Sequence, residues 1–255
     1  KALFHPVIQS RPQPLMKRIF IGTRGWSYKS WEKEFYPEGL PQKRHFEFYV
    51  TQFSTVEINL TFYRLPTHKA VEGWREHAPE GFVYAIKGSR FITHIKRIKD
   101  LDGALARFFE HIQPLQKRIG VILWQLPPTL RKDVARLSAF LKLLPRRYHH
   151  AVEFRHESWL DDEVFEALRK HKTTHVSVSS LRMPMNLTVT SEVVYIRFHG
   201  LEGGAAHDYT HDELKPWAAH IRAQRRRGKT VYAYFNNDAN VRAPGNAKLL
   251  MQMTR

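Results

Sequence analysis

The stretch Val56-Glu57-Ile58-Asn59 alternates apolar and polar side chains, and the later stretches Val152-Glu153-Phe154-Arg155 and Ile196-Arg197-Phe198-His199 repeat this alternation. Side chains two residues apart on a β-strand point to the same face. Each stretch therefore predicts a strand with one apolar face, for packing against helices, and one face of charged or amide side chains. Strands of this kind favour a common opening around which the polar faces meet.

Short runs rich in β-branched and aromatic residues recur along the chain, at 19–23, 54–58, 82–87, 119–125, 150–155, 174–179, 193–199 and 230–236. Most intervals between them hold apolar residues at the spacing of one helix face, as in Phe46, Tyr49, Val50 and Phe53. Strand followed by helix, repeated eight times, is the pattern of a parallel barrel. The sequence thus predicts the α/β class and a single (β/α)8 TIM-like barrel.

The length of the chain agrees with this architecture. A closed α/β barrel typically takes about 250 residues, and the chain has 255. Met16-Lys17-Arg18 leads directly into the first apolar run, which begins at Ile19. We therefore expect residues 16–255 to form the barrel domain and residues 1–15 to be an N-terminal extension outside it.

The composition limits the chemistry and the location. The absence of cysteine excludes disulfides, a cysteine nucleophile and any cysteine-ligated metal or cluster. No apolar run reaches the length of a membrane span, and the first residues lack the apolar core of a signal peptide. These features predict a cytoplasmic protein without a membrane partner.

Lysine and arginine number 41 against 24 aspartates and glutamates, which gives a formal net charge of +17. A positive field of this size attracts polyanions and phosphorylated molecules. An anionic small molecule or a nucleic acid is therefore the expected partner. The alternative is a basic surface without a dedicated partner, and the sequence carries no indication of the oligomeric state.

Polar side chains stand where several predicted strands end. Lys87 closes the third strand, Gln125 closes the fourth, and Asn236 follows the eighth. Barrel active sites are built at the C-terminal ends of the strands, so these side chains are expected to meet at one mouth. The candidate catalytic residues are Glu57, Glu153 and His199. The candidate ligand-binding residues are Asn59, Tyr63, Lys87, His94, Gln125, Arg155, Trp159, Arg197 and Asn236.

The charged candidates have more than one interpretation. Glu57 and Glu153 can form an acid and base pair, since neighbouring charges drive carboxyl pKa values apart. Alternatively, each carboxylate closes the barrel end by a salt bridge to Arg155, Arg197 or Lys87. Lys87 can form a Schiff base if it is desolvated, or it can serve as an anion ligand or an ion-pair partner.

His199 can act as a general base or as a metal ligand. Metal binding is less favoured, because a cation would share the mouth with Arg155, Arg197 and Lys87. The close-spaced ligand signatures of metal sites are also missing. We therefore assign no metal-binding residue; a divalent metal is compatible with the sequence but not indicated by it.

Side chains beyond the strand ends are open to two interpretations as well. His94 either lines the pocket or lies in a surface loop. The aromatic residues Trp26, Tyr28, Tyr63 and Trp159 can stack a base or a sugar, although aromatic residues at this density usually serve in packing.

The motifs of the chain form a combination that is quite specific. They are IGTRGWSY (21–28), VEINLTFYRLP (56–66), Lys87 with Thr93-His94, QLPP (125–128), EFRHESW (153–159), RFHG (197–200) and YFNN (234–237). In these motifs the chain resembles the YecE-like family, catalogued as domain of unknown function 72, from about residue 19 to the C-terminus. The resemblance implies a TIM-like barrel and, by analogy alone, a relation to barrel nucleases of the endonuclease IV type.

Two positions depart from the pattern expected of that family. Arg24 stands in the first turn where a serine is more usual, and Ser177-Val178-Ser179-Ser180 ends the sixth strand where an acidic residue is commoner. The second difference argues against any mechanism that needs a third carboxylate at the mouth.

We expect a hydrolase-like enzyme, a phosphoester hydrolase or nuclease, that acts on a phosphate-bearing or nucleic-acid substrate. The lysine and arginines would hold the anion, the carboxylates or His199 would move protons, and the amides would orient the ligand. One rival is a non-catalytic nucleic-acid binder that uses the net charge. Another is a carbohydrate-active enzyme, which requires Glu57 and Glu153 about 5 to 9 Å apart across an open cleft.

Overall fold

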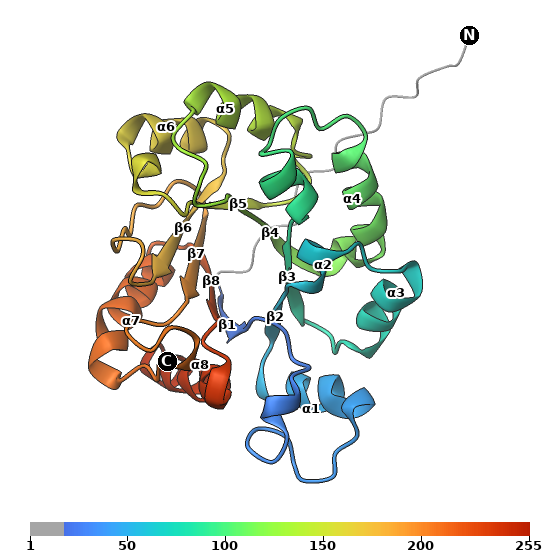
Figure 1. The fold of residues 1–255 in the computed structure, drawn as a ribbon. Coiled ribbons are helices and arrows are strands. Elements are labelled where there is room, and N and C mark those ends of the chain that lie inside the picture. Colours follow the sequence, from blue (N-terminus) through green and yellow to red (C-terminus); the bar gives the residue numbers. More distant parts are fainter. Residues whose placement is uncertain (1–17) are drawn as a thin grey trace.

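Eight strands form one parallel sheet that wraps into a barrel. In the computed structural model, which describes residues 18–255, they are β1 (Ile19–Thr23), β2 (Thr55–Ile58), β3 (Val83–Lys87), β4 (Ile119–Gln125), β5 (His150–Glu153), β6 (Thr174–Ser179), β7 (Val193–Phe198) and β8 (Thr230–Phe235). Their order is β1-β8-β7-β6-β5-β4-β3-β2, and Figure 1 shows the ring of strands with the helices outside it. The expected TIM-like α/β barrel is confirmed. The extension expected at residues 1–15 lies outside the described residues.

The two ends of the strand order, β1 and β2, meet and nearly close the ring. A parallel bridge pairs Arg24 with Glu57, and the Gly25 N–H donates to the Glu57 carbonyl oxygen at 2.8 Å. The backbones can approach because Gly22 has no side chain: a Cβ there would lie 2.5 Å from the Thr55 carbonyl oxygen.

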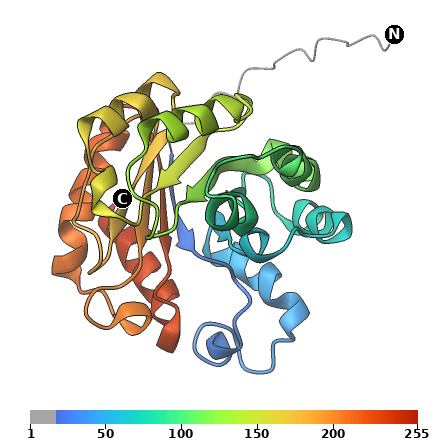
Figure 2. The same cartoon turned by 45° about the horizontal axis from the view of Figure 1, so that its top comes forward.

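Helices follow most of the strands and cover the outside of the barrel. They are α1 (His45–Gln52), α2 (Leu60–Tyr63), α3 (His68–His77), α4 (Ala104–Ile112), α5 (Val134–Leu143), α6 (Asp162–Lys170), α7 (His211–Arg226) and α8 (Arg242–Met253). The helices α3, α5, α6 and α7 are each capped at the N-terminus by a side-chain oxygen that accepts a hydrogen bond from a backbone N–H of the first turn. The capping residues are Thr67, Asp133, Asp161 and Thr210. In the turned view of Figure 2, the strands lie between the blue-to-green helices and the yellow-to-red ones. Within residues 18–255, no helix is long and apolar enough to cross a membrane.

The alternation of strand side chains separates two cores. One set packs outward against the helices, and Val56, Ile86, Ile122 and Ile196 belong to that large cluster. The alternate set points into the barrel, where a second cluster contains Phe20, Ala85, Val121, Leu123, Ala151, Val176, Val178, Tyr195, Tyr232 and Tyr234. The polar residues at the strand ends continue this inward set. The same alternation that buries the apolar faces therefore delivers charged side chains to the mouth.

Tyrosines fill the interior below those charged side chains. The Tyr234 hydroxyl lies 2.6 Å from the Thr55 hydroxyl, and the Tyr195 hydroxyl donates to Glu57 Oε2 at 2.6 Å. Both tyrosines are fully buried. This aromatic layer keeps water away from the underside of the charged groups.

Gly120→Ala is expected to destabilise the barrel by about 1–3 kcal/mol, because overpacking forces a core to shift. A Cβ at Gly120 would lie 2.4 Å from the Tyr232 hydroxyl oxygen and 2.5 Å from Val83 Cγ1. Urea titration measures the free energy of unfolding. The matched control is Gly73→Ala in α3, where a Cβ meets nothing within 4 Å, so alanine should be neutral or stabilise by up to about 1 kcal/mol. Equal stability of the two variants would contradict this packing of Tyr232.

Candidate active site at the mouth of the barrel

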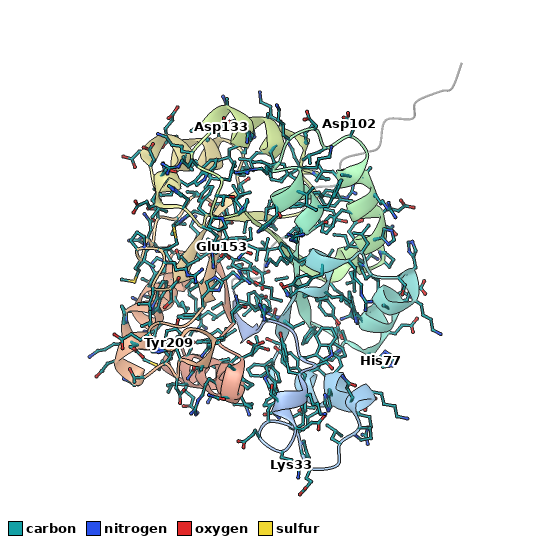
Figure 3. The ribbon with its side chains drawn as sticks, viewed as in Figure 1. Lys33, His77, Asp102, Asp133, Glu153 and Tyr209 are labelled. Carbon is teal, nitrogen blue, oxygen red and sulfur yellow. The ribbon has the colours of Figure 1, made fainter. Side chains whose placement is uncertain are left out.

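Arg197 on β7 bridges the two carboxylates inside the barrel. It donates from Nε to Glu57 Oε2 at 2.9 Å, from Nη2 to Glu57 Oε1 at 2.7 Å, and from Nη1 to Glu153 Oε2 at 2.5 Å. All three side chains are fully buried, and Figure 3 places Glu153 near the centre of the ring of strands. One guanidinium therefore joins Glu57 on β2 and Glu153 on β5. We call these three residues the ionic bridge.

The second oxygen of Glu153 is surrounded by donors. Glu153 Oε1 accepts from Gln125 Nε2 at 2.8 Å and from Arg155 Nη1 at 2.9 Å, and it lies 3.1 Å from His199 Nε2. Gln125 and Glu153 are register partners on β4 and β5, so their side chains lie side by side on the inward face. Both oxygens of the Glu153 carboxylate are therefore occupied by hydrogen bonds.

The charges around Glu153 keep it ionised. Burial by itself would raise the pKa of its carboxyl group, but Arg197, His199 and Arg155 together hold that pKa well below its usual value. An ionised and fully hydrogen-bonded carboxylate can orient cations, but it is poorly suited to donate a proton at neutral pH. This geometry supports the salt-bridge interpretation of Glu153 over the acid and base pair.

His199 is a neutral imidazole fixed between three partners. Burial lowers its pKa to about 4, although the nearby Glu153 carboxylate acts in the opposite direction. Its Nδ1 lies 3.0 Å from Asn236 Nδ2. Its Nε2 lies 3.1 Å from Glu153 Oε1, which can only accept, and 3.0 Å from Arg155 Nη1, which can only donate.

Lys87 ends β3 at the edge of the ionic bridge, and its ammonium group is isolated. Its Nζ lies 3.9 Å from the centre of the Phe62 ring, and within residues 18–255 it has no hydrogen bond and no carboxylate at ion-pair distance. Burial, and after it the Arg197 charge, lower the pKa of Lys87 to about 7 against the pull of Glu153 and Glu57. At neutral pH a large share of this side chain is therefore the free amine.

His94 lies beside Lys87 on the same aromatic ring. It belongs to the short helix η3 (Phe91–Ile95), and its ring meets the Phe62 ring edge-on with centroids 5.0 Å apart. Burial and then the positive charge of Lys87 lower the pKa of His94 to about 4. His94 is therefore a neutral, half-buried group at the mouth.

Four buried polar atoms just beyond the strand ends lack a hydrogen-bond partner in the described part of the chain. They are Asn59 Oδ1, Asn236 Oδ1, Asn237 Oδ1 and Arg24 Nε. Buried polar atoms in folded proteins are nearly always paired with protein, water or ligand. These atoms therefore mark positions where water or a bound ligand is expected to complete the site.

Within the described residues, two of the expected ligand-binding residues make no hydrogen bond to the charged groups of the mouth. Trp159 is fully buried, stacks on Phe154, and donates from its indole N–H to the Leu130 carbonyl oxygen at 2.7 Å. These contacts are those of a packing residue, which is the other interpretation of its sequence position. Tyr63, at the end of α2, is 69% exposed, and its ring meets the Phe62 ring edge-on.

Two residues of the site were not predicted. Tyr195 binds Glu57, and its position two residues before Arg197 on the same strand face was a signal that could have identified it. Phe62 supports both Lys87 and His94 from the short helix α2. No pattern in the sequence distinguishes Phe62 from the many aromatic residues that serve in packing.

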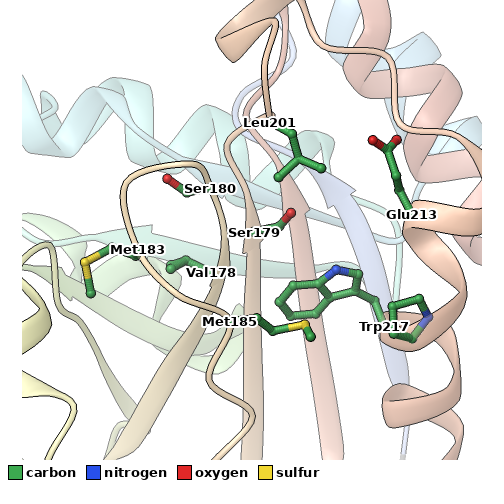
Figure 4. A pocket seen from close by; sticks show the side chains of 9 residues that line it. Val178, Ser179, Ser180, Met183, Met185, Leu201, Glu213 and Trp217 are labelled. Carbon is green, nitrogen blue, oxygen red and sulfur yellow. The ribbon is translucent and has the colours of Figure 1, made fainter.

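In the described part of the chain, neither a metal site nor a separate pocket adds a further group to the mouth of the barrel. Among residues 18–255, no group of three or more His, Asp or Glu side chains is arranged to hold a metal ion. A mostly apolar pocket of about 220 Å³ lies between the end of β6, the loop after it and α7 (Figure 4). It is lined by Val178, Ser179, Ser180, Met183, Met185, Leu201, Glu213, Pro216 and Trp217. None of the predicted site residues lines this pocket.

Arg197→Met is expected to lower the free energy of unfolding by about 3–5 kcal/mol at pH 7, because it leaves two buried carboxylates without their shared cation. In the wild type the pKa of Glu153 is lowered on folding. Its contribution to stability is therefore present above the unfolded pKa of about 4.3 and lost as the pH falls toward the folded value. In the variant, burial without the cation raises the carboxyl pKa, so protonation at pH 5 should recover part of the lost stability.

Urea titrations at pH 7 and pH 5 measure this difference. The matched control is Arg169→Met on α6, which removes a surface ion pair with Glu166 and should change the free energy of unfolding by less than about 1 kcal/mol. A loss in Arg197→Met no larger than that of the control, or a larger loss at pH 5 than at pH 7, would contradict the role of the ionic bridge.

Comparison with known proteins agrees with the architecture. The 32% identity to the UPF0759 protein YecE of Escherichia coli K12 extends over 139 residues, which cover 54% of this chain and 48% of that protein. The chain thus spans about half the length of that relative. The UPF0759 protein YunF of Bacillus subtilis is 22% identical over 92% of this chain and 94% of its own.

Solved structures show the same fold over nearly the whole chain. A DUF72 family protein of Thermotoga maritima superposes with a TM-score of 0.85 at 29% identity, covering 92% of this chain and 98% of that one. A DUF72 family protein of Enterococcus faecalis superposes with a TM-score of 0.79 at 19% identity, covering 93% and 95%. The family model described as protein of unknown function DUF72 matches residues 20–255. The chain belongs to the DUF72 family.

Proposed function

We propose that this protein is a hydrolase-like enzyme that acts on a phosphate-bearing substrate at the C-terminal mouth of its barrel. The observation that carries the proposal is the positive charge beside the ionic bridge. Arg197 already serves Glu57 and Glu153, and two further cations, Arg155 and Lys87, stand next to it. When Lys87 is protonated, these side chains hold one positive charge more than the carboxylates can neutralise, which favours an anionic ligand.

Arg155 has the geometry of an anion ligand. Its Nη1 contacts Glu153 Oε1 and His199 Nε2, at 2.9 and 3.0 Å, and its side chain is 23% exposed. No other hydrogen bond of its guanidinium occurs within the described residues. The remaining N–H groups form a planar fork that fits two phosphate oxygens. The contact with Glu153 holds that fork in place.

Lys87 is the group best suited to move a proton. General acid and base catalysis is most efficient when the pKa of the group lies near the working pH, and the pKa of Lys87 is lowered to about 7 by burial. Glu57 and Glu153 are both hydrogen-bonded to Arg197, so we assign them a positioning role. The unpaired Asn59 and Asn236 oxygens are available to accept from hydroxyl groups of the substrate.

The carbohydrate-active alternative finds no support in this geometry. It needs two carboxylates that face each other across an open cleft. Here Glu57 and Glu153 are both fully buried and are joined by the same guanidinium.

Arg155→Met is expected to raise KM for the phosphate-bearing substrate by about tenfold to a hundredfold, because a charge-assisted hydrogen bond contributes about 1.5–3 kcal/mol. Steady-state phosphate release from sugar phosphates and nucleotides, together with strand cleavage of oligonucleotides, identifies the substrate and measures KM. The matched control is Arg169→Met, a surface arginine on α6, which should leave KM unchanged.

Two results would contradict the proposal. The first is that the wild-type protein hydrolyses no member of the panel, and that wild type and Arg155→Met bind inorganic phosphate equally well. The second is oligonucleotide binding that falls steeply with salt, without turnover and without dependence on Arg155. That second result would favour the non-catalytic nucleic-acid binder.

A further inference from the structure

We infer that Lys87 Nζ acts as a nucleophile and forms an imine with an aldehyde or ketone carbonyl group of the substrate. The inference deepens the proposed function and rests on its anion site. It narrows the substrate class to phosphate esters that also carry a carbonyl group. Four observations lead to it.

The first observation is the isolation of the amine. Buried lysines are rare and are usually paired with a carboxylate, yet within residues 18–255 Lys87 Nζ contacts the face of the Phe62 ring and no carboxylate at ion-pair distance. Such a ring contact contributes about 0.5–2 kcal/mol to holding a cation and leaves the nitrogen lone pair unused when the amine is neutral. Lys87 therefore has no structural ion pair that would account for its burial.

The second observation is access. Lys87 is 5% exposed, and its Nζ is not among the fully enclosed polar atoms without a partner in the described residues. It stands at the C-terminal end of β3, where barrels bind their substrates. A small ligand that enters the mouth can therefore reach the nitrogen.

The third observation is the rigid attachment of Lys87. The Thr61 hydroxyl donates to the Lys87 carbonyl oxygen at 2.6 Å, and the next residue, Gly88, donates its N–H to the Leu123 carbonyl oxygen at 2.7 Å. A Cβ on Gly88 would lie 2.3 Å from the Trp124 ring, so the backbone is pressed against β4. A fixed backbone directs the lysine stem toward one position in the mouth, which favours reaction at a defined substrate atom.

The fourth observation is the charge environment. The charged groups that act on Lys87 are Arg24 in the turn after β1, Glu57 on β2, Glu153 on β5 and Arg197 on β7. Lys87 in turn lowers the pKa of His94. Burial is the largest influence on Lys87 and favours the neutral amine, and the arginines act in the same direction. Desolvation next to other cations is how enzymes prepare a lysine for imine formation.

The proposed step needs no oxidant or reductant. The nitrogen lone pair of the neutral amine attacks the carbonyl carbon, and one proton passes from the nitrogen to the carbonyl oxygen to give a neutral carbinolamine. The second nitrogen proton passes to the hydroxyl group, which leaves as water while the C=N bond forms. Addition of water reverses the sequence and regenerates both the amine and the carbonyl group. Arg155 would hold the phosphate of the same substrate during these steps.

Reductive trapping tests the inference on the full-length wild-type protein. The protein is incubated at pH 7 with glycolaldehyde phosphate and cyanoborohydride, which reduces an imine to a stable secondary amine. Peptide mass spectrometry then locates and quantifies the adduct. Glycolaldehyde without phosphate is the matched probe, Lys87→Arg is the variant that keeps the positive charge, and Arg155→Met tests the anion site.

We expect the adduct to form at Lys87 at least about tenfold faster than at any other lysine. About half of a lysine with a pKa of about 7 is neutral at pH 7, whereas an ordinary lysine of pKa about 10.4 is neutral in roughly one molecule in 2,500. Trapping at residue 87 should disappear in Lys87→Arg. Arg155→Met should slow trapping of the phosphorylated probe toward the rate of the unphosphorylated one.

The remaining outcomes separate the two proposals. The imine proposal would be contradicted by an adduct spread evenly over surface lysines, or by the absence of an adduct at Lys87 with either probe. Phosphate binding by Arg155 would then still be tested by the KM measurement on Arg155→Met. Rapid trapping at Lys87 that is equal for both probes and indifferent to Arg155→Met would support the imine and count against the phosphate site.

Discussion

The guanidinium of Arg197, held between Glu57 and Glu153, is the interaction on which the mouth of this barrel depends. It joins β7 to β2 and β5, and neither of those strands is its neighbour in the sheet. Burying a carboxylate costs several kcal/mol unless a cation and further donors compensate. Here Tyr195 and Gln125 supply additional hydrogen bonds to the two carboxylates. The network therefore fixes the strand ends across the barrel, where no backbone ladder can act.

The saturation of this network decides where we place the proposed chemistry. A carboxylate whose oxygens are occupied by arginine has little capacity to exchange protons, so the proposed reactive groups are those at the edge of the ionic bridge. Lys87 and Arg155 occupy that edge, and each has nitrogen atoms without a protein partner in the described residues. The tyrosines below exclude water from the barrel interior, which lowers the local dielectric and favours the neutral form of Lys87.

Membership of the DUF72 family agrees with the barrel fold. A shared fold does not determine a reaction, so a function has to be argued from the side chains at the strand ends. The structure also explains how the unusual Arg24 is accommodated. Its Nη2 lies 3.3 Å from Asp238 Oδ2 in the loop after β8, so the extra charge of the first turn has a carboxylate partner. Its Nε stays buried without a protein acceptor in the described residues.

The sequence by itself determined the strands and the direction of their side chains. Alternation with a period of two is a local property of extended backbone, so it placed Glu57, Lys87, Glu153 and Arg197 on the inward face before any contact was known. Only the tertiary structure decided which of these groups touch. The bridging position of Arg197, the Phe62 ring under Lys87 and the burial of Trp159 depend on how distant segments pack. A side chain's direction follows from its own backbone, whereas its partner is set by barrel closure and by segments far away in the sequence.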